Sequence, residues 1–231
     1  MSGHTEFNRA AFLAGSLAVI GGGLPRRGRS AEPAGPSVDP KEGLARLMSG
    51  NERFVNNDIP TTSAVAEKRE LLTESQAPFA AILSCSDSRV VPNLIFVQGI
   101  GDLFIARVAG NYPDDLVTAS IEYAIEHLGT RLIMVLGHQN CGAVKAVYTA
   151  IETKKSLPVH LSTIERLMSP GIESVVKAHG TEMAAVEANV RAAVATLRTT
   201  SSVLATGVKS GRLLVVGAVY QLGSGKVQLL D

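Results

Sequence analysis

Two short segments combine side chains that could hold a metal ion. Residues 85–89 read Cys-Ser-Asp-Ser-Arg, and His138 is followed three positions later by Cys141. Two thiolates and one imidazole match a Cys₂His zinc set, whose three protein ligands leave a fourth position open, as in catalytic rather than structural zinc sites. An open Zn²⁺ lowers the pKa of a bound water to about 7 and so makes hydroxide available at neutral pH.

Asp87 and Arg89 could orient such a metal-bound water. They are two positions apart, so on a turn both side chains can point toward the same ion. A bidentate pair with Arg89 would hold the Asp87 carboxylate so that it accepts a hydrogen bond from the water. Without this tether, Asp87 could rotate and take the fourth position itself. The alternative for this pair is a structural salt bridge at a turn.

Other readings of the same residues predict no metal. The two thiols and the histidine could be ordinary core residues, or Cys85 and Cys141 could form a disulfide, which would leave Asp87, Arg89 and His138 without a role. A Cys-dependent phosphatase is excluded, because that chemistry needs a longer spacing between its Cys and Arg than residues 85–89 provide.

The elements that must position these groups follow from the apolar pattern. Short apolar runs alternate with helical patterns, which predicts an α/β fold with a mostly parallel sheet of about four to five strands covered by helices. The predicted strands are 79–83, 103–108, 131–136 and 213–219, with 226–230 as a short hairpin partner. The predicted helices are 40–54, 64–75, 115–127 and 142–153, and 161–204 reads as helical segments broken near Pro170 and Gly180.

This arrangement predicts where the metal ligands lie. The first predicted strand runs toward Cys85, and the third runs toward His138, with Cys141 just before a helix. Functional groups of an open parallel sheet gather at the carboxyl ends of its strands. We therefore expect both cysteines and His138 to converge at one edge of the sheet, although they are far apart in the sequence.

Composition excludes several classes of protein. The chain has 231 residues, of which 45% are hydrophobic and 19% charged, so disordered and collagen-like chains are excluded. A formal net charge of +1 gives no sign of a nucleic-acid partner, and two cysteines exclude a disulfide-rich scaffold. We expect one domain over 40–231, preceded by a linker at 32–39.

Residues 1–31 are predicted to be an export signal. Ala10 to Leu24 is uncharged and apolar, too short for an ordinary membrane span, and suits the apolar region of a secretory signal. Residues 8–13 resemble a twin-arginine signal, although Ala10 stands where the second Arg belongs. We expect a periplasmic or secreted protein without stable membrane insertion after processing. An unused signal would leave an uncleaved hydrophobic tail on a cytoplasmic protein.

The paired motifs at 85–89 and 138–141 resemble the Cys-x-Asp-x-Arg and His-x-x-Cys motifs of the β-class carbonic anhydrases. The likeness runs from about Lys41 to Leu230. It includes Ser49–Phe54, Gly101–Phe104, Arg107–Asn111, Ser120–Ala124 and Glu187–Val190. The resemblance implies reversible hydration of carbon dioxide to bicarbonate and a proton by zinc-bound hydroxide, with one Zn²⁺ per subunit.

The resemblance also implies roles for the residues of both motifs. Cys85, His138 and Cys141 match the metal ligands of the family. Asp87 and Arg89 match its catalytic pair beside the metal. Relatives that hydrolyse carbon disulfide or carbonyl sulfide have nearly the same motifs, so they remain an alternative. So do a catalytically inactive, zinc-stabilised interaction protein and a thiol redox protein.

Four further residues match positions that the family uses for its substrate. Gln76 matches a substrate-orienting amide, and the backbone N–H of Gly142 lies at a helix N-terminus that suits an anion such as bicarbonate. Phe104 and Tyr123 match residues that line the carbon dioxide pocket, with Phe104 expected to come from the partner subunit. Taken without the family, Gln76 is an ordinary loop amide and Phe104 an ordinary core aromatic.

The resemblance further implies a homodimer or homotetramer, with residues 40–60 as an N-terminal arm that embraces the partner. Four positions depart from the family, among them Asn93 and Val91, which replace a frequent Glu and a frequent Pro. Val97 stands where many members have Asp, which removes a polar group near the site. Ile82 stands where bicarbonate-inhibited members have Trp, and this chain has no Trp. We therefore expect the open form, with water as the fourth ligand and Asp87 paired to Arg89.

Overall fold

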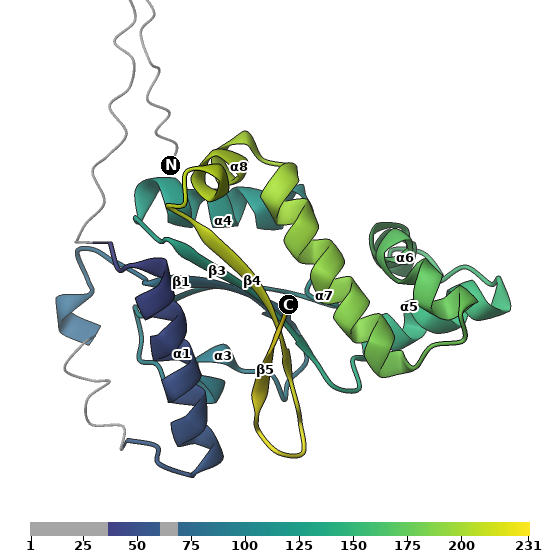
Figure 1. Ribbon diagram of the computed structural model, residues 1–231, viewed down its shortest axis with the longest axis horizontal. Coiled ribbons are helices and arrows are strands. Elements are labelled where there is room, and N and C mark those ends of the chain that lie inside the picture. Colours follow the sequence, from purple (N-terminus) through teal and green to yellow (C-terminus); the bar gives the residue numbers. More distant parts are fainter. Residues whose placement is uncertain (1–36, 61–68) are drawn as a thin grey trace, which may run out of the picture.

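The sheet at the centre of the fold has five strands. The computed structural model describes residues 37–60 and 69–231, and in them the strand order is β2-β1-β3-β4-β5 (Figure 1). The strands are β1 Ala80–Cys85, β2 Leu103–Val108, β3 Leu132–His138, β4 Leu214–Tyr220 and β5 Val227–Leu230. The first four pair in parallel, and β5 is antiparallel to β4, as the predicted hairpin requires.

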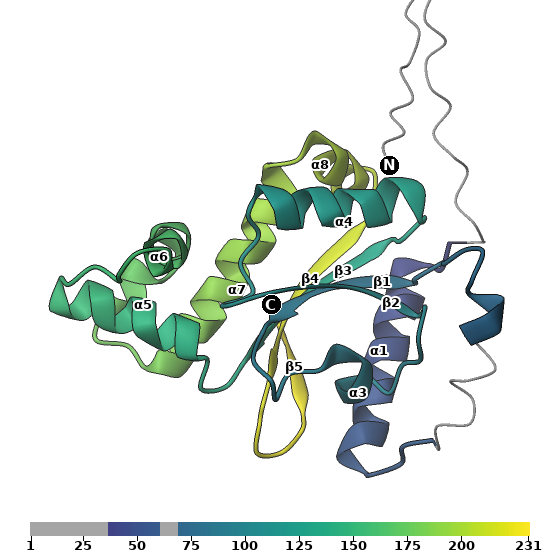
Figure 2. The ribbon, with the colours of Figure 1, turned by 180° about the vertical axis from the view of Figure 1, so that it is seen from behind.

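Helices cover both faces of this sheet. They are α1 Pro40–Val55, α3 Pro92–Ile95, α4 Asp115–His127, α5 Gly142–Thr153, α6 Leu161–Lys177, α7 Glu182–Thr199 and α8 Ser202–Lys209. α1 and α3 lie on one face, whereas α4, α7 and α8 lie on the other, and α5 and α6 continue this second layer beyond α7 (Figures 1 and 2). The predicted α/β class with a helix-covered, mostly parallel sheet is confirmed.

The interior consists of two apolar clusters, one on each face of the sheet. Along β1, Leu83 and Cys85 belong to the cluster under α7, and Ile82 belongs to the cluster under α1. Successive side chains of a strand point to opposite faces, so a strand buried on both faces reads as a continuous apolar run. This explains why the strands were visible in the sequence as short apolar segments.

α1 is part of the interior of its own chain. Asp39 caps its first turn, and Leu47 is fully buried in the cluster on that face. The side chain of Asn51 donates to the carbonyl oxygens of Ile95 and Gly225, at 3.2 and 2.8 Å, and accepts from a backbone N–H of β5. The helix therefore packs on its own sheet, and its predicted contact with a partner subunit remains a prediction.

Two helix predictions need correction, and one short helix was missed. α6 continues through Pro170, because Met168, Ile172 and Val176 keep one face buried on both sides of the proline and compensate for the hydrogen bond it cannot donate. The predicted break near Gly180 is confirmed. Of the predicted helix 64–75, residues 69–71 are helical and 72–75 are not, while 64–68 lie outside the described residues. The short helix α3 was not predicted.

The predicted export signal, residues 1–31, lies outside the described residues, as does most of the predicted linker. Among residues 37–60 and 69–231, no helix combines the length and the apolar character needed to cross a bilayer.

Val97 occupies a conformation that a β-branched residue rarely adopts. Its φ is +47° in the turn that follows α3, where Cβ approaches the backbone. Asn and Asp adopt this left-handed region at lower cost. We expect Val97→Asn to raise the free energy of unfolding by about 1 kcal/mol, measured by urea denaturation. Val55→Asn, at a half-buried helical position, is the control and is expected to give no gain. A free energy of unfolding of Val97→Asn equal to or below that of the wild-type protein would contradict backbone strain at Val97.

Candidate metal centre

The carboxyl ends of two neighbouring strands bring the first two ligand-type side chains together. Cys85 is the last residue of β1, and His138 is the last residue of β3. The two strands pair in parallel with Ser84 opposite Leu136, so their ends lie at the same edge of the sheet. Cys141 follows after a tight turn and is the N-cap residue of α5. The convergence expected from the sequence is therefore present.

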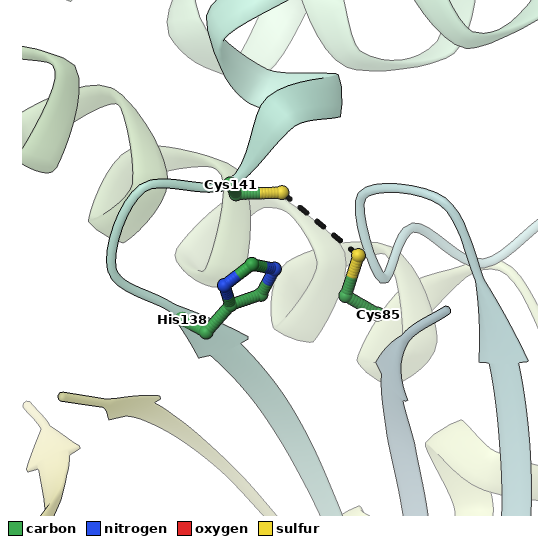
Figure 3. Close-up of side chains that lie close together, drawn as sticks. All are labelled: Cys85, His138 and Cys141. Carbon is green, nitrogen blue, oxygen red and sulfur yellow. Dashed lines mark hydrogen bonds between the residues drawn. The ribbon is translucent and has the colours of Figure 1, made fainter. Parts of the chain in front are cut away.

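The three side chains have the spacing of a metal site. The sulfurs of Cys85 and Cys141 are 4.0 Å apart, and the ligand atoms of both cysteines and His138 lie within 4.8 Å of one another. Two thiolates on one tetrahedral Zn²⁺ would be about 3.8 Å apart. Figure 3 shows the two sulfurs facing each other with the imidazole beside them. Both cysteines are free, so the disulfide alternative is not found.

The orientation of His138 fits a ligand. Its Nδ1 lies 2.9 Å from the backbone carbonyl of Gln139, which can only accept, so Nδ1 carries the proton. Nε2 is then an unprotonated acceptor, and it is buried with no hydrogen-bond partner among the described residues. A backbone carbonyl that fixes the tautomer in this way is typical of metal-binding histidines. The donor set and this orphaned nitrogen therefore fit a Zn²⁺ ion.

The two thiols do not lose their protons equally. The S–H of Cys141 stabilises a thiolate at Cys85, which lowers the pKa of Cys85 to about 4 even though burial opposes ionisation. The same interaction, together with burial, raises the pKa of Cys141. At neutral pH the metal-free pair therefore carries one negative charge and one proton.

This distribution of protons predicts how metal affinity depends on pH. Because a metal binds thiolates, binding near neutral pH must displace the proton of Cys141 but none from Cys85. We expect the affinity for zinc to rise about tenfold per pH unit between pH 7 and 9, since one proton is released per ion. Competition with a chromophoric chelator of known pH dependence measures this slope. A hundredfold change per unit would mean that two protons are released per ion, contrary to the lowered pKa of Cys85.

Asp87 is held by Arg89 as the sequence predicted. Its Oδ1 accepts from Nε of Arg89 at 2.9 Å, and its Oδ2 accepts from Nη2 at 2.8 Å. These hydrogen bonds hold the pKa of the Asp87 carboxyl far below its usual range, so it is ionised at neutral pH. Oδ2 also lies 3.9 Å from Nε2 of His138. The carboxylate is thus beside the three ligand-type side chains, while both of its oxygens are engaged by Arg89.

Arg107 is a site residue to which the sequence analysis gave no role. Its Nε donates to the carbonyl of Cys85 at 3.0 Å, and its Nη2 donates to the carbonyl of Asp87 at 2.7 Å. It therefore fixes the backbone on both sides of Ser86. Its segment was noticed only as part of a resemblance, because its position opposite Ser84 depends on the register of β2 against β1.

Gly142 is the first residue of α5, beside Cys141, and no atom lies within 4 Å of the position that a Cβ would take. Apart from its own helix, the side of its Cα where a side chain would stand is therefore open. Its predicted contact with an anionic substrate or product at the helix N-terminus remains a prediction.

Gln76, Phe104 and Tyr123 are not brought to the three ligands within one chain. Gln76 is exposed in the loop before β1. Phe104 pairs with Ala81, four positions before the end of β1, which is about 13 Å along the strand. Tyr123 packs near Phe104, with ring centroids 6.4 Å apart, and is 49% exposed. Their predicted roles in substrate binding, with Phe104 acting from a partner subunit, remain predictions.

Comparison with known proteins identifies relatives with a shared name. The family model described as carbonic anhydrase matches residues 80–227. A carbonic anhydrase of Mycolicibacterium smegmatis is 37% identical over 195 residues, which cover 84% of this chain and 95% of the relative. Carbonic anhydrase 2 of Mycobacterium tuberculosis is 36% identical over 200 residues, 85% of this chain and 95% of the relative.

Solved structures agree with this similarity. A Coccomyxa β-carbonic anhydrase, determined in complex with acetazolamide, has a TM-score of 0.65 and 28% identity over 81% of this chain and 86% of its own. One of two tetrameric β-carbonic anhydrases of Sordaria macrospora has a TM-score of 0.66 over 82% of this chain and 98% of its own, and at 22% identity this likeness concerns the fold alone.

Proposed function

The chain belongs to the β-class carbonic anhydrase family, and we propose that it catalyses the zinc-dependent, reversible hydration of carbon dioxide to bicarbonate and a proton. The observation that carries the proposal is the meeting of two free thiols and an orphaned imidazole nitrogen within 4.8 Å. Three ligands leave one position of a tetrahedral ion for water, which is the arrangement of a catalytic site.

The metal and the chain have separate tasks in this proposal. Zn²⁺ held by Cys85, His138 and Cys141 would supply the Lewis acidity that makes hydroxide available at neutral pH. The ionised Asp87 would accept a hydrogen bond from the O–H of the reacting water and so orient a lone pair of the water oxygen toward carbon dioxide. Arg89 engages both Asp87 oxygens. This pairing would keep the carboxylate from binding the metal in place of water.

The remaining groups act on the substrate and the product. The backbone N–H of Gly142 would donate to bicarbonate as the negative charge develops, because Gly142 is the first residue of α5 and lies at a helix N-terminus. Gln76, Phe104 and Tyr123 would complete the pocket across a subunit interface. We therefore propose a homodimer or homotetramer. A neighbour of the same fold is described as tetrameric.

One experiment tests the proposed function. Zinc content and carbon dioxide hydration are measured on the same purified sample, the latter by stopped-flow. We expect one zinc ion per subunit and hydration activity that rises with pH from 6 to 9. Sulfide release from carbon disulfide or carbonyl sulfide without hydration would replace this activity with the related hydrolase. Full zinc with no turnover of any of the three substrates would indicate an inactive, metal-stabilised protein.

We also propose that the protein is exported to the periplasm or secreted. The support is the uncharged apolar stretch from Ala10 to Leu24 and the signal-like segment around it. Fractionation of cells that express the full chain tests the proposal. Deletion of residues 2–31 is the control that should stay in the cytoplasm, and a cytoplasmic full-length chain would contradict export.

A further inference from the structure

A buried asparagine on α7 contacts the turn that touches Cys85. The side chain of Asn189 is 1% exposed, and its Nδ2 donates to the carbonyl of Gly110 at 2.8 Å. The N–H of the same Gly110 donates to the sulfur of Cys85 at 3.4 Å. One glycine therefore connects a helix that covers the sheet with one of the three ligand-type side chains.

Gly110 needs this support to hold its N–H in place. Its φ is +80°, and glycine rotates more freely about its two backbone bonds than any other residue. Its N–H and its carbonyl belong to two different peptide planes joined at Cα. The bond from Asn189 fixes the second plane and so limits the rotation that would turn the N–H away from Cys85.

Asn189 is an unusual residue for its position. The rest of the buried face of α7 is apolar, comprising Ala185, Val186, Val190, Ala193, Val194 and Leu197. Burial of an amide without hydrogen bonds costs about 1–3 kcal/mol, and its Oδ1 has no partner among the described residues. Packing alone would favour leucine here. The hydrogen bond to Gly110 is thus the interaction that accounts for an amide at this buried position.

We propose that Asn189 is a positioning residue that, through Gly110, maintains an N–H···S hydrogen bond on Cys85 and thereby strengthens metal binding. A donor aimed at the sulfur engages one of its lone pairs and fixes the orientation of the Cys85 side chain toward the other two ligand-type side chains. The inference rests on the metal site of the proposed function. Outer partners of metal ligands typically change metal affinity by about 10–100-fold.

The first test compares two buried asparagines. Asn189→Leu keeps the branched shape of the side chain, although leucine is larger, and removes the bond to Gly110. We expect the metal affinity of the folded protein to fall about tenfold. Asn51→Leu is the matched control, because Asn51 is also buried and hydrogen-bonded but lies on the other face of the sheet. It should lower the stability without changing the metal affinity. Unchanged affinity in Asn189→Leu, or an equal loss in both variants, would overturn the inference.

The second test needs no variant and therefore does not depend on folding of a mutant. In wild-type protein loaded with ¹¹³Cd, the amide of Gly110 should couple to the metal through the sulfur of Cys85 and exchange slowly with solvent. Absence of both signals in metal-loaded protein would refute the inference. A wild-type protein that binds neither zinc nor cadmium would instead refute the proposed metal-dependent function, so the two failures can be told apart.

Discussion

Replacement of Cys85 by serine is expected to abolish both metal binding and carbon dioxide hydration. A serine hydroxyl is not ionised at neutral pH, whereas the metal ligand must be a thiolate. We expect zinc affinity to fall by more than about a hundredfold, because loss of a direct ligand exceeds the loss from an outer partner. Activity should fall to the uncatalysed rate, and the melting temperature should fall because the ion no longer joins β1 to the start of α5.

The measurements are zinc per subunit, stopped-flow hydration and thermal unfolding of the same preparations. Ser86→Ala is the matched control, since its exposed side chain is the neighbour of Cys85 and makes none of the hydrogen bonds described here. It should retain the metal. Cys141→Ser should reproduce the defects of Cys85→Ser. One zinc ion per subunit and normal turnover in either cysteine variant would show that the replaced cysteine is not a metal ligand.

Asp87→Asn is expected to lower turnover about a hundredfold while one zinc ion per subunit is retained. The amide has the shape of the carboxylate but lacks its charge and one of its acceptors. It can therefore no longer hold Arg89 on one side and accept from the reacting water on the other. Because Asp87 is not among the three ligand-type side chains, the loss should appear in kcat rather than in metal content.

Two further variants define the role of this carboxylate. Asp114→Asn makes the same chemical change at the N-cap of α4, where asparagine is also a good cap, and should leave both activity and zinc unchanged. Arg89→Lys removes the bidentate contact and should cause an intermediate loss, because a lysine holds one carboxylate oxygen at a time. Normal turnover in Asp87→Asn would show that the pair is only a salt bridge at a turn.

The sequence predicted the parts of the site that depend on strand ends and short spacing. Cys85 and His138 could be placed together because parallel strands end at one edge, and Asp87 could be paired with Arg89 because they are two positions apart. The helix break at Gly180 was also correct. Pro170 was misread as a break, because local propensity ignores the buried face that holds α6 together.

The remaining contacts could not be predicted because they depend on tertiary packing. Arg107 reaches the carbonyls of Cys85 and Asp87 only through the register of β2 against β1. Asn189 reaches Gly110 only because α7 packs over the turn that follows β2. Neither contact corresponds to a characteristic spacing of residues in the sequence.

The two clusters of the interior have a consequence for how this protein responds to its surroundings. Cys85 belongs to the cluster under α7, whereas His138 is aligned with Tyr220, which belongs to the cluster under α1. An ion held by both side chains ties the two halves of the interior together, so neither half can melt without releasing it. If the ion is zinc, as proposed, the free energy of unfolding would rise by about 1.4 kcal/mol for every tenfold rise of free zinc above the dissociation constant.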